Sequence, residues 1–286
     1  MRHSNLHTHT VFSDGYYTVE ETVLAAIDNN MISLGISDHS SADFDPCGIR
    51  TRSIDAYHRE VRRCAEKYKD RIEVYLGLEL DGYSVVDKAD YDYLIGDVHY
   101  VKCSDGNLHG IDWNKENQQK VIDDFFDHDP LAMAKHYFAT YVERQQINRP
   151  DVLGHFDLVR LFGLMPTESK AYLDAATEAL IACLKVTPIM EINMVPVVLR
   201  GDTEPYPRNN ILKEAVAHGA KLVLSSDAHK VENLQKGFDD EILRLKALGI
   251  REIVQFVGGR FVEQPRARFR HRDPAVATRS AGRRSG

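Results

Sequence analysis

Two histidines separated by one residue, His7 and His9, lie near the start of the chain. The surrounding residues, 5–10, have the character of a short strand, in which alternate side chains point to the same face. Two neutral imidazoles on one face can bind a single divalent cation. Because 13 histidines in 286 residues also give this spacing by chance, the interpretation requires further ligands elsewhere in the sequence.

Further candidate ligands stand at the downstream ends of successive apolar runs, each of which predicts a buried strand. They are Asp38, His39, Glu79, His99, His155, Glu191, Asn193, Asp227 and His229. In a β/α barrel the carboxyl ends of all strands converge on one rim. An open sheet would bring together only the residues beside its switch point. The distribution of polar residues therefore favours a barrel.

The elements that must position these residues follow from the same pattern. Strands are predicted over residues 5–10, 32–37, 72–80, 93–99, 151–155, 189–193 and 220–226, with a last strand near 252–257. Helices are predicted over 18–30, 53–69, 115–126, 130–147, 169–185, 207–218 and 231–247. Thr18 and Glu21 form a capping-box pattern, and residues 101–114 are expected to be irregular. Strands that alternate with helices imply a mainly parallel sheet.

The chemistry of the candidate ligands predicts a multinuclear metal site. Imidazoles and carboxylates without thiolates suit Zn, Mn or Fe, and they argue against an all-oxygen Ca or Mg site. The set is larger than one ion can use, and a carboxylate such as Glu79 can bridge two ions. Closely spaced divalent ions suit the hydrolysis of phosphate esters, because they activate water at neutral pH and stabilise the attacking and leaving oxygens.

The composition is that of one soluble globular domain, with 43% hydrophobic and 28% charged residues. No apolar run approaches the roughly 18 residues needed to cross a bilayer. The start of the sequence leaves no room for the apolar core of a signal peptide, so a cytoplasmic protein is expected. The four cysteines include no Cys-x-x-Cys pair, and neither a disulfide framework nor a thiolate zinc site is predicted.

Charge divides the chain into two parts. Residues 265–286 hold seven arginines and one aspartate, a charge of +6. Because the whole chain has a net charge of −7, residues 1–264 carry a charge of −13. An acidic body argues against binding to nucleic acid. We therefore expect a β/α barrel over residues 1–264 and a basic, disordered tail over residues 265–286.

Six separated motifs resemble, in the same order, the signatures of the PHP (polymerase and histidinol phosphatase) superfamily. They are His7-x-His9, Asp38-His39, Glu79, Gly96-Asp97-Val98-His99, Gly154-His155-Phe156-Asp157 and Ser226-Asp227-Ala228-His229. The resemblance implies a distorted (β/α)7 barrel with two or three metal ions at the carboxyl ends of its strands. Finer features are similar to the histidinol-phosphatase branch: Glu191-Ile192-Asn193, Leu199-Arg200, Glu204-Pro205-Tyr206-Pro207 and the long insertion between His99 and His155.

The same resemblance implies three metal positions. The first would use His7, His9, Glu79 and Asp227, and the second Glu79, His99 and His155. The third would use His39, His229 and Asp14, at a position where some relatives have histidine. Read without the resemblance, Asp14 is equally well a turn residue before Gly15.

Roles in binding and catalysis are implied for the remaining residues. Arg160 and Arg200 match positions where relatives bind the substrate phosphate, a contact that suits guanidinium geometry, although each could instead be a solvated arginine. Asn193 is expected to line the pocket. Glu191 is expected behind the metal ligands, and Asp38 behind its neighbour His39. Asp227 or His229 is the candidate proton donor to the leaving alkoxide.

These inferences predict a metal-dependent phosphomonoesterase that acts on a small phosphorylated substrate, L-histidinol phosphate, in histidine biosynthesis. Residues 194–198 depart from the small and polar residues that relatives commonly have there. The alternative is therefore a PHP phosphoesterase for a nucleotide, an oligonucleotide end or a phosphotyrosine protein. A non-catalytic, metal-stabilised regulatory domain is a remoter alternative, because each motif retains a residue able to bind metal.

Overall fold

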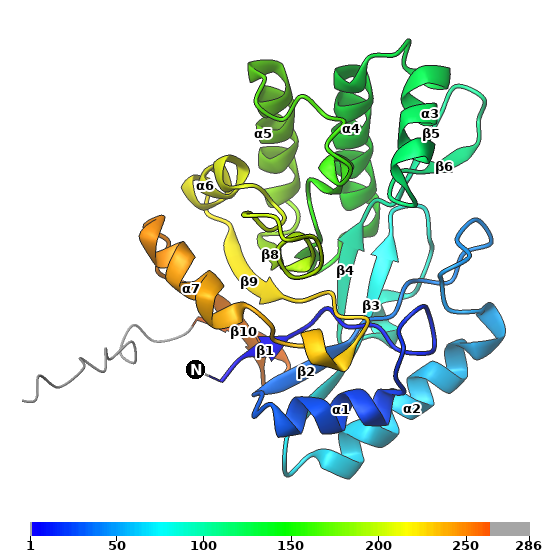
Figure 1. The fold of residues 1–286 in the computed structure, drawn as a ribbon. Coiled ribbons are helices and arrows are strands. Elements are labelled where there is room, and N and C mark those ends of the chain that lie inside the picture. The colour runs from blue at the N-terminus through cyan, green and yellow to red at the C-terminus, as the bar shows by residue number, and fades with distance from the viewer. Residues whose placement is uncertain (1, 264–286) are drawn as a thin grey trace, which may run out of the picture.

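The computed structural model describes residues 2–263, and the predicted tail over residues 265–286 lies outside this range. The centre of the described part is a curled nine-stranded sheet in the order β1-β2-β3-β4-β7-β8-β9-β10-β11 (Figure 1). Every neighbouring pair is parallel except β10 and β11. The strands are β1 (Ser4–Asn5), β2 (Ser33–Ile36), β3 (Glu73–Asp81), β4 (Tyr93–Asp97), β7 (Val152–Leu153), β8 (Ile189–Asn193), β9 (Lys221–Ser225), β10 (Val254–Val257) and β11 (Arg260–Glu263).

The sheet closes on itself where the segment after β1 meets the segment after β9. Thr8 and Ala228 form a parallel bridge. The amide of His9 donates to the carbonyl of Ala228 at 2.9 Å, and the amide of Ala228 donates to the carbonyl of His7 at 3.2 Å. Seven parallel strands, from β1 to β9, therefore surround one core, and the predicted distorted (β/α)7 barrel is confirmed.

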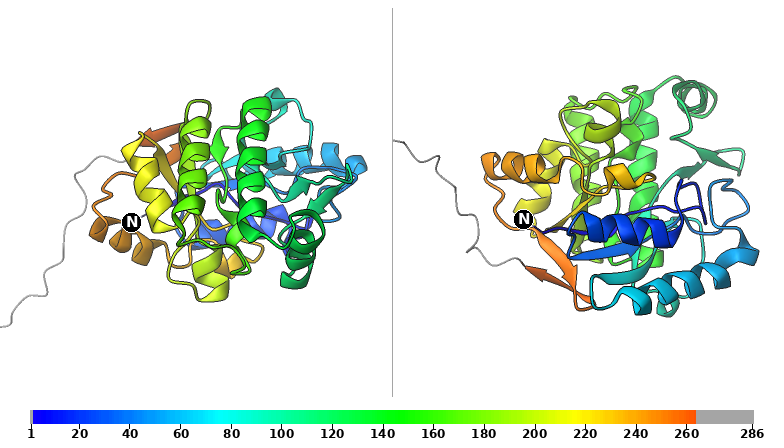
Figure 2. Two further views of the ribbon diagram at one scale, coloured as in Figure 1. Left: turned by 90° about the horizontal axis from the view of Figure 1, so that it is seen from above. Right: turned by 60° about the horizontal axis from the view of Figure 1, so that its bottom comes forward.

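The helices cover the outside of this barrel. In Figure 1, α3, α4 and α5 stand above the sheet, α6 and α7 lie to its left, and α1 and α2 lie below it, an arrangement that Figure 2 shows from two further directions. The helices are α1 (Val19–Asp28), α2 (Ile54–Tyr68), α3 (Lys115–Phe125), α4 (Pro130–Asn148), α5 (Lys170–Leu184), α6 (Asn209–Ala217) and α7 (Phe238–Ala247). None of the helices within residues 2–263 is both long and apolar enough to span a bilayer.

Local sequence explains where the predicted helices begin. At α1, Thr18 Oγ1 accepts a hydrogen bond from the amide of Glu21, and the Glu21 carboxylate accepts one from the amide of Thr18 at 2.8 Å. This is the predicted capping box. At α4, the side chain of Asp129 accepts from the amide of Leu131 at 2.8 Å, and Pro130 occupies the first turn.

The interior of the barrel is filled, so the site must lie at the rim. The ring of Tyr93 crosses the interior, and its hydroxyl donates to the carbonyl of Leu6. A Cβ atom on Gly35 would come within 1.9 Å of the Tyr93 hydroxyl oxygen, and one on Gly77 within 2.1 Å of a carbon of the ring. Only glycine leaves space for Tyr93 at both positions. The large apolar side chains around it are Leu6, Ile95, Val152, Ile189, Val223, Val254 and Phe256.

Five segments differ from the sequence prediction. The strand predicted over residues 5–10 is confined to β1, and His7 and His9 follow it on either side of the bridge that Thr8 forms with Ala228. Residues 101–114, expected to be irregular, contain an antiparallel hairpin of β5 (Tyr100–Lys102) and β6 (Leu108–Gly110). Its Val101 is fully buried in the core, which explains why the segment is ordered. The helix predicted over 231–247 is divided, because Gly237 adopts a φ of 78° immediately before α7. Residues 196–200 form one turn of π-helix, and β11 was not predicted.

Candidate metal centre

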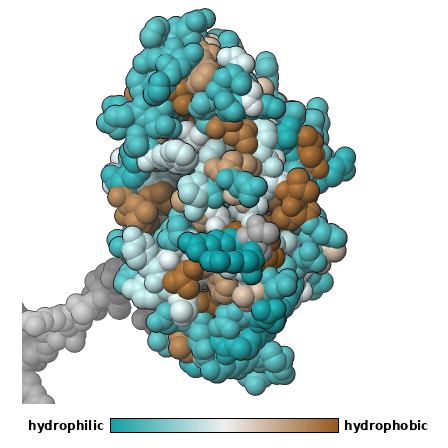
Figure 3. Space-filling model, turned by 90° about the vertical axis from the view of Figure 1, so that its right-hand side faces the viewer, coloured by the Kyte–Doolittle hydropathy of each residue, from teal (hydrophilic) through white to brown (hydrophobic). Residues whose placement is uncertain are grey.

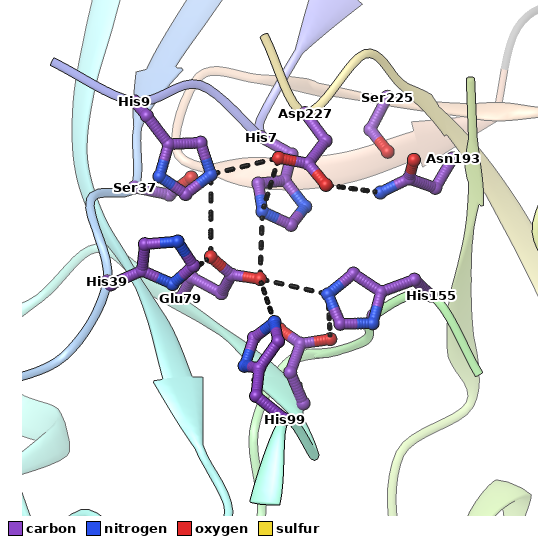
Figure 4. Close-up of polar contacts among 12 residues, drawn as sticks. His7, His9, Ser37, His39, Glu79, His99, His155, Asn193, Ser225 and Asp227 are labelled. Atoms are coloured by element: carbon purple, nitrogen blue, oxygen red, sulfur yellow. Dashed lines mark hydrogen bonds and ion pairs between the residues drawn. The ribbon is translucent and has the colours of Figure 1, made fainter. Parts of the chain in front are cut away.

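The predicted ligands meet at the carboxyl ends of the strands, as Figure 4 shows. They come from sequence positions far apart, but the parallel strands deliver them to one rim of the barrel. His7 and His9 follow β1 and point to the same side, as their spacing predicted. The others lie at or just after the ends of β2, β3, β4, β7 and β9: His39, Glu79, His99, His155, Asp227 and His229.

One oxygen of Glu79 faces three imidazoles. Glu79 Oε1 lies 3.3 Å from His7 Nε2, 3.4 Å from His99 Nε2 and 3.0 Å from His155 Nε2. Both the carboxylate and His7 are almost completely shielded from solvent. This oxygen therefore stands at the junction of the first two predicted metal positions.

The second oxygen of Glu79 faces two further imidazoles. Glu79 Oε2 lies 2.7 Å from His39 Nδ1 and 3.4 Å from His9 Nε2. Asp227 approaches from the opposite strand, with Oδ1 3.0 Å from His9 Nε2 and 3.6 Å from His7 Nε2. Because its two oxygens face different imidazoles, Glu79 is placed to bridge two cations.

Asp14 joins the group predicted for a third ion. Its Oδ1 lies 3.2 Å from His229 Nε2, 3.6 Å from His39 Nε2 and 3.7 Å from His9 Nδ1. One ligand atom from each of these four residues lies within 4.8 Å of the others. Burial raises the pKa of the Asp14 carboxyl, but its histidine neighbours outweigh burial and hold the pKa well below its usual range.

The residues fit bound cations, because the centre concentrates buried polar atoms that have no hydrogen-bond partner. These atoms are His7 Nε2, His9 Nδ1 and Nε2, Glu79 Oε2, Asp97 Oδ1 and Oδ2, His99 Nδ1 and His155 Nδ1. Leaving such an atom unpaired in the interior costs about 1–3 kcal/mol. His7 Nε2, His9 Nε2 and Glu79 Oε2 face one another rather than solvent, and divalent cations would supply their missing partners.

Electrostatics favour positive charge in the centre. Burial lowers the pKa of His39, but the Glu79 carboxylate outweighs this effect and raises the pKa to about 10. Burial likewise opposes the charged form of His7, whose pKa is raised well above its usual value by Asp227, Glu191 and Glu79. Without bound cations, the carboxylates thus favour protonated imidazoles. Metal binding must replace those protons, because only the neutral ring is a ligand.

Glu191 lies behind the predicted ligands and hydrogen-bonds to two of them. Its Oε2 accepts hydrogen bonds from His7 Nδ1 at 2.9 Å and from Ser225 Oγ at 2.5 Å. Its Oε1 accepts from the amide of His155 at 2.7 Å. These bonds leave Nε2 of His7 directed at the centre, the arrangement by which a second carboxylate commonly orients a metal-binding histidine.

Asn193 also supports the centre instead of opening onto a pocket. Its Nδ2 donates to Asp227 Oδ2 at 3.1 Å and to Glu191 Oε1 at 3.0 Å, and its Oδ1 accepts from the amide of Val195 at 3.0 Å. The residue is fully buried in β8. The hydrogen bonds therefore give no support to the predicted contact with substrate, and they indicate that Asn193 orients Asp227.

The partners of Asp38 differ from those expected. Its carboxylate accepts from the amide and hydroxyl of Thr10, at 2.7 and 2.8 Å, and from the amide and hydroxyl of Ser13, at 3.1 and 2.6 Å. These bonds fix the loop that carries Asp14, whereas we expected Asp38 to support His39. Neighbouring side chains on an extended chain point to opposite faces, which explains the difference.

Asp227 adopts an unusual backbone conformation, with a φ of 50°. This left-handed region is uncommon for residues other than glycine, asparagine and aspartate, and it often marks functional sites. The conformation places the carboxylate between His7 and His9. His229, two residues later, is the more exposed of the two candidate proton donors.

Asp81 and Asp97, to which the sequence assigned no role, also border the centre. Asp81 Oδ2 accepts from the amide of His99 at 2.9 Å and lies 3.6 Å from its Nδ1. Asp81 stands two residues after Glu79 in one strand, so strand alternation could have identified it. Asp97 Oδ1 lies 3.3 Å from His155 Nε2, and burial raises the pKa of Asp97 to about 7.

The two predicted phosphate-binding arginines differ in their surroundings. Arg160 is anchored, because its Nε donates to Asp157 Oδ2 at 3.0 Å and its Nη2 donates to the carbonyl of Pro205 at 2.7 Å. Its guanidinium lies 4.5 Å from the centre of the Tyr206 ring, and that ring lies 6.4 Å from the ring of His155. Arg200 is exposed at the end of the π-helical turn. Arg160 is thus held close to the centre, whereas phosphate binding by either arginine stays a prediction.

Comparison with known proteins places this centre in context. The model of one family, described as PHP domain, matches residues 5–194. A protein of Schizosaccharomyces pombe named "Probable histidinol-phosphatase" is 29% identical over 192 residues, which are 62% of this chain and 60% of that protein. The chain thus spans about three-fifths of that relative. A protein of the same name from Deinococcus radiodurans is 25% identical over 268 residues, 87% of this chain and 94% of that protein.

Solved structures share the fold. Histidinol phosphate phosphatase from Lactococcus lactis, crystallised with zinc, L-histidinol and phosphate, aligns with a TM-score of 0.65 and 18% identity. That alignment covers 91% of this chain and 99% of the Lactococcus chain. At these identities the likeness establishes the barrel fold.

Proposed function

We propose that this chain, which belongs to the PHP domain family, is a metal-dependent phosphomonoesterase that hydrolyses L-histidinol phosphate to L-histidinol and phosphate. The observation that carries the proposal is the position of Glu79, whose two oxygens face five imidazoles with unpaired nitrogens among them. The zinc, L-histidinol and phosphate bound by the Lactococcus lactis enzyme support the same substrate here. Such an activity belongs to histidine biosynthesis, and the cytoplasm stays the predicted location.

The residues that would hold the ions form three adjoining groups. The first consists of His7, His9, Glu79 and Asp227, the second of Glu79, His99 and His155, and the third of Asp14, His39 and His229. When bound, zinc, manganese or iron lowers the pKa of a bound water and stabilises negative charge on phosphate oxygens.

The protein side chains have separate tasks in this reaction. Arg160, fixed by Asp157, contributes positive charge beside His155 for the phosphate oxygens. Glu191 holds the ring of His7 in the orientation that ligation requires, and Asp81 fixes the backbone of His99 through its amide. Protonation of the departing alkoxide is assigned to Asp227 or His229.

Packing around Met194 bears on the choice of substrate. The departure from relatives at residues 194–198 suggested an altered pocket, but the Met194 side chain is buried in the main core, and Val197 and Val198 pack against the same core. The apolar side chains of this segment therefore mainly fill the core and do not reshape the pocket. This observation favours L-histidinol phosphate over the nucleotide, oligonucleotide and phosphotyrosine alternatives.

The direct experiment is phosphate release by purified protein loaded with Mn²⁺ or Zn²⁺. We expect kcat/KM for L-histidinol phosphate to exceed that for a nucleoside monophosphate, a 5′-phosphorylated oligonucleotide and phosphotyrosine. A higher kcat/KM for one of these esters would show that the alternative substrate class is the correct one. Absence of turnover with every ester, in protein shown to contain metal, would favour the regulatory domain.

A further inference from the structure

Asp112 directs a carboxylate at the candidate metal centre, although no sequence motif assigns it. It follows the β5–β6 hairpin, and its Oδ2 lies 4.0 Å from His99 Nε2. That nitrogen is also the one that faces Glu79 Oε1, at 3.4 Å. Asp112 therefore lies on the side of His99 that faces the centre, and its side chain keeps 24% of its surface exposed.

The backbone holds Asp112 in place. The amide of the preceding residue, Ile111, donates to the carbonyl of His99 at 2.9 Å, and the Ile111 side chain is fully buried. The carbonyl of Ile111 accepts from Gln118 Nε2 at 3.1 Å. Asp112 is thus tied to the same segment as the predicted ligand His99, so its distance from the centre is set by the fold.

One oxygen of the Asp112 carboxylate has no hydrogen-bond partner among the described residues. This oxygen, Oδ1, is buried. Over residues 2–263, the ion pairs include no lysine or arginine bound to Asp112. A carboxylate held in this way can accept a hydrogen bond from a ligand without first breaking a bond within the protein.

Aromatic side chains lie near this position, because Trp113 follows Asp112 in the chain, and burial and nearby carboxylates, Asp112 among them, raise the pKa of the Tyr100 hydroxyl. The Tyr100 ring lies 6.2 Å from that of Trp113 and 5.0 Å from that of Phe44, and more than half of Trp113 is exposed. Burial raises the pKa of the nearby Cys47 thiol to about 11, and Asp112 contributes to the same shift. Aromatic faces beside carboxylates favour organic cations. The side of the molecule that carries the β5–β6 hairpin is mostly hydrophilic, with separate hydrophobic patches (Figure 3).

We infer that Asp112 is a specificity-determining residue that selects phosphate esters with an ammonium group on the carbon next to the ester methylene. L-Histidinol phosphate has this arrangement, so the inference rests on the proposed function. Once the phosphate is held at the centre, a short substituent brings the ammonium to the border of His99, where Asp112 accepts its hydrogen bond. The exposed ring of Trp113 is available to the imidazole.

The test compares two substrates that differ only in the ammonium group. Initial rates are measured for L-histidinol phosphate and for its deamino analogue, imidazolylpropyl phosphate, with metal-loaded wild-type protein and Asp112→Asn. We expect the substitution to lower the ratio of the two kcat/KM values by about 10- to 100-fold, the range that a hydrogen bond to a charged group provides. Glu116→Gln removes the same charge from an exposed position at the start of α3 and should leave the ratio unchanged.

Two results would overturn the inference. One is an equal loss of kcat/KM for both substrates, with or without loss of bound metal, since Asp112 would then act on the centre itself. The other is no change in either kcat/KM value, which would show that Asp112 does not contact the substrate. Failure of the proposed function is distinguishable, because it appears in the wild-type protein as no turnover of L-histidinol phosphate. In that case the inference is tested with ethanolamine phosphate and ethyl phosphate, which also differ by one ammonium group. The ratio of their kcat/KM values is compared between the wild-type protein and Asp112→Asn.

Discussion

His7 and Glu191 are hydrogen-bonded to each other inside the barrel, Nδ1 to Oε2 at 2.9 Å, although 184 positions separate them in the sequence. This bond fixes which nitrogen of His7 faces Glu79. Replacing Glu191 with glutamine removes the charge and keeps the size of the side chain. We expect kcat/KM and metal affinity to fall by about 10- to 100-fold, the usual cost of losing such a supporting residue. Steady-state rates and metal content check this, with exposed Glu178→Gln as the matched control.

Removal of a direct ligand should cost more. His99→Ala and His155→Ala each delete an imidazole that faces Glu79 Oε1. We expect turnover to fall by more than the roughly 100-fold upper limit for supporting residues, while circular dichroism stays that of the wild type. His128→Ala changes an exposed histidine and is the control. Full activity of either ligand variant would contradict the metal assignment.

One tyrosine hydroxyl tests how α2 is attached to the barrel. Tyr57, from α2, donates to the carbonyls of Ile36 and Gly77, both at 2.8 Å. Tyr57→Phe leaves these two buried carbonyls without that donor, and we expect a loss of about 1–3 kcal/mol in the free energy of unfolding. Urea denaturation measures it, and Tyr16→Phe at an exposed position should be neutral. A Tyr57 variant as stable as the wild type would show that the hydroxyl contributes nothing to stability.

Acid should weaken the protein at a position remote from the centre. Burial lowers the pKa of His3 below its ordinary value of 6.5, and hydrogen bonding to Asp239 only partly opposes this. The folded state therefore prefers neutral His3, so its contribution to stability is complete above pH 6.5 and is lost as the pH falls through the folded pKa. We expect the stability advantage of wild type over His3→Gln to shrink between pH 8 and pH 5.5 in denaturation experiments. An advantage that grows toward low pH would reverse the sign of the shift.

The sequence predicted the barrel and its ligands because a polar residue stands at the end of each apolar run. Parallel strands then bring these ends together on one rim of the barrel. Glu79 and His155 could be found in this way. The role of Asp38 could not, since its bonds to Thr10 and Ser13 depend on how a loop folds back. Asp112 was likewise missed, because it follows a hairpin in a segment whose polar residues and glycines suggested irregular structure.

The bridge between Thr8 and Ala228 also determines when the centre can exist. His7 and His9 leave the ribosome before the rest of the barrel, whereas Asp227 is added after almost all of the barrel has been made. Asn5 and Ser226, which are hydrogen-bonded beside this bridge, are separated by 221 positions. Contacts between residues so far apart in the sequence form late in folding, because the chain must first lose the conformational entropy of the loop between them. A nascent chain thus cannot complete the first group of ligands until its last barrel strand is in place, and metal capture reports that synthesis of the domain is nearly finished.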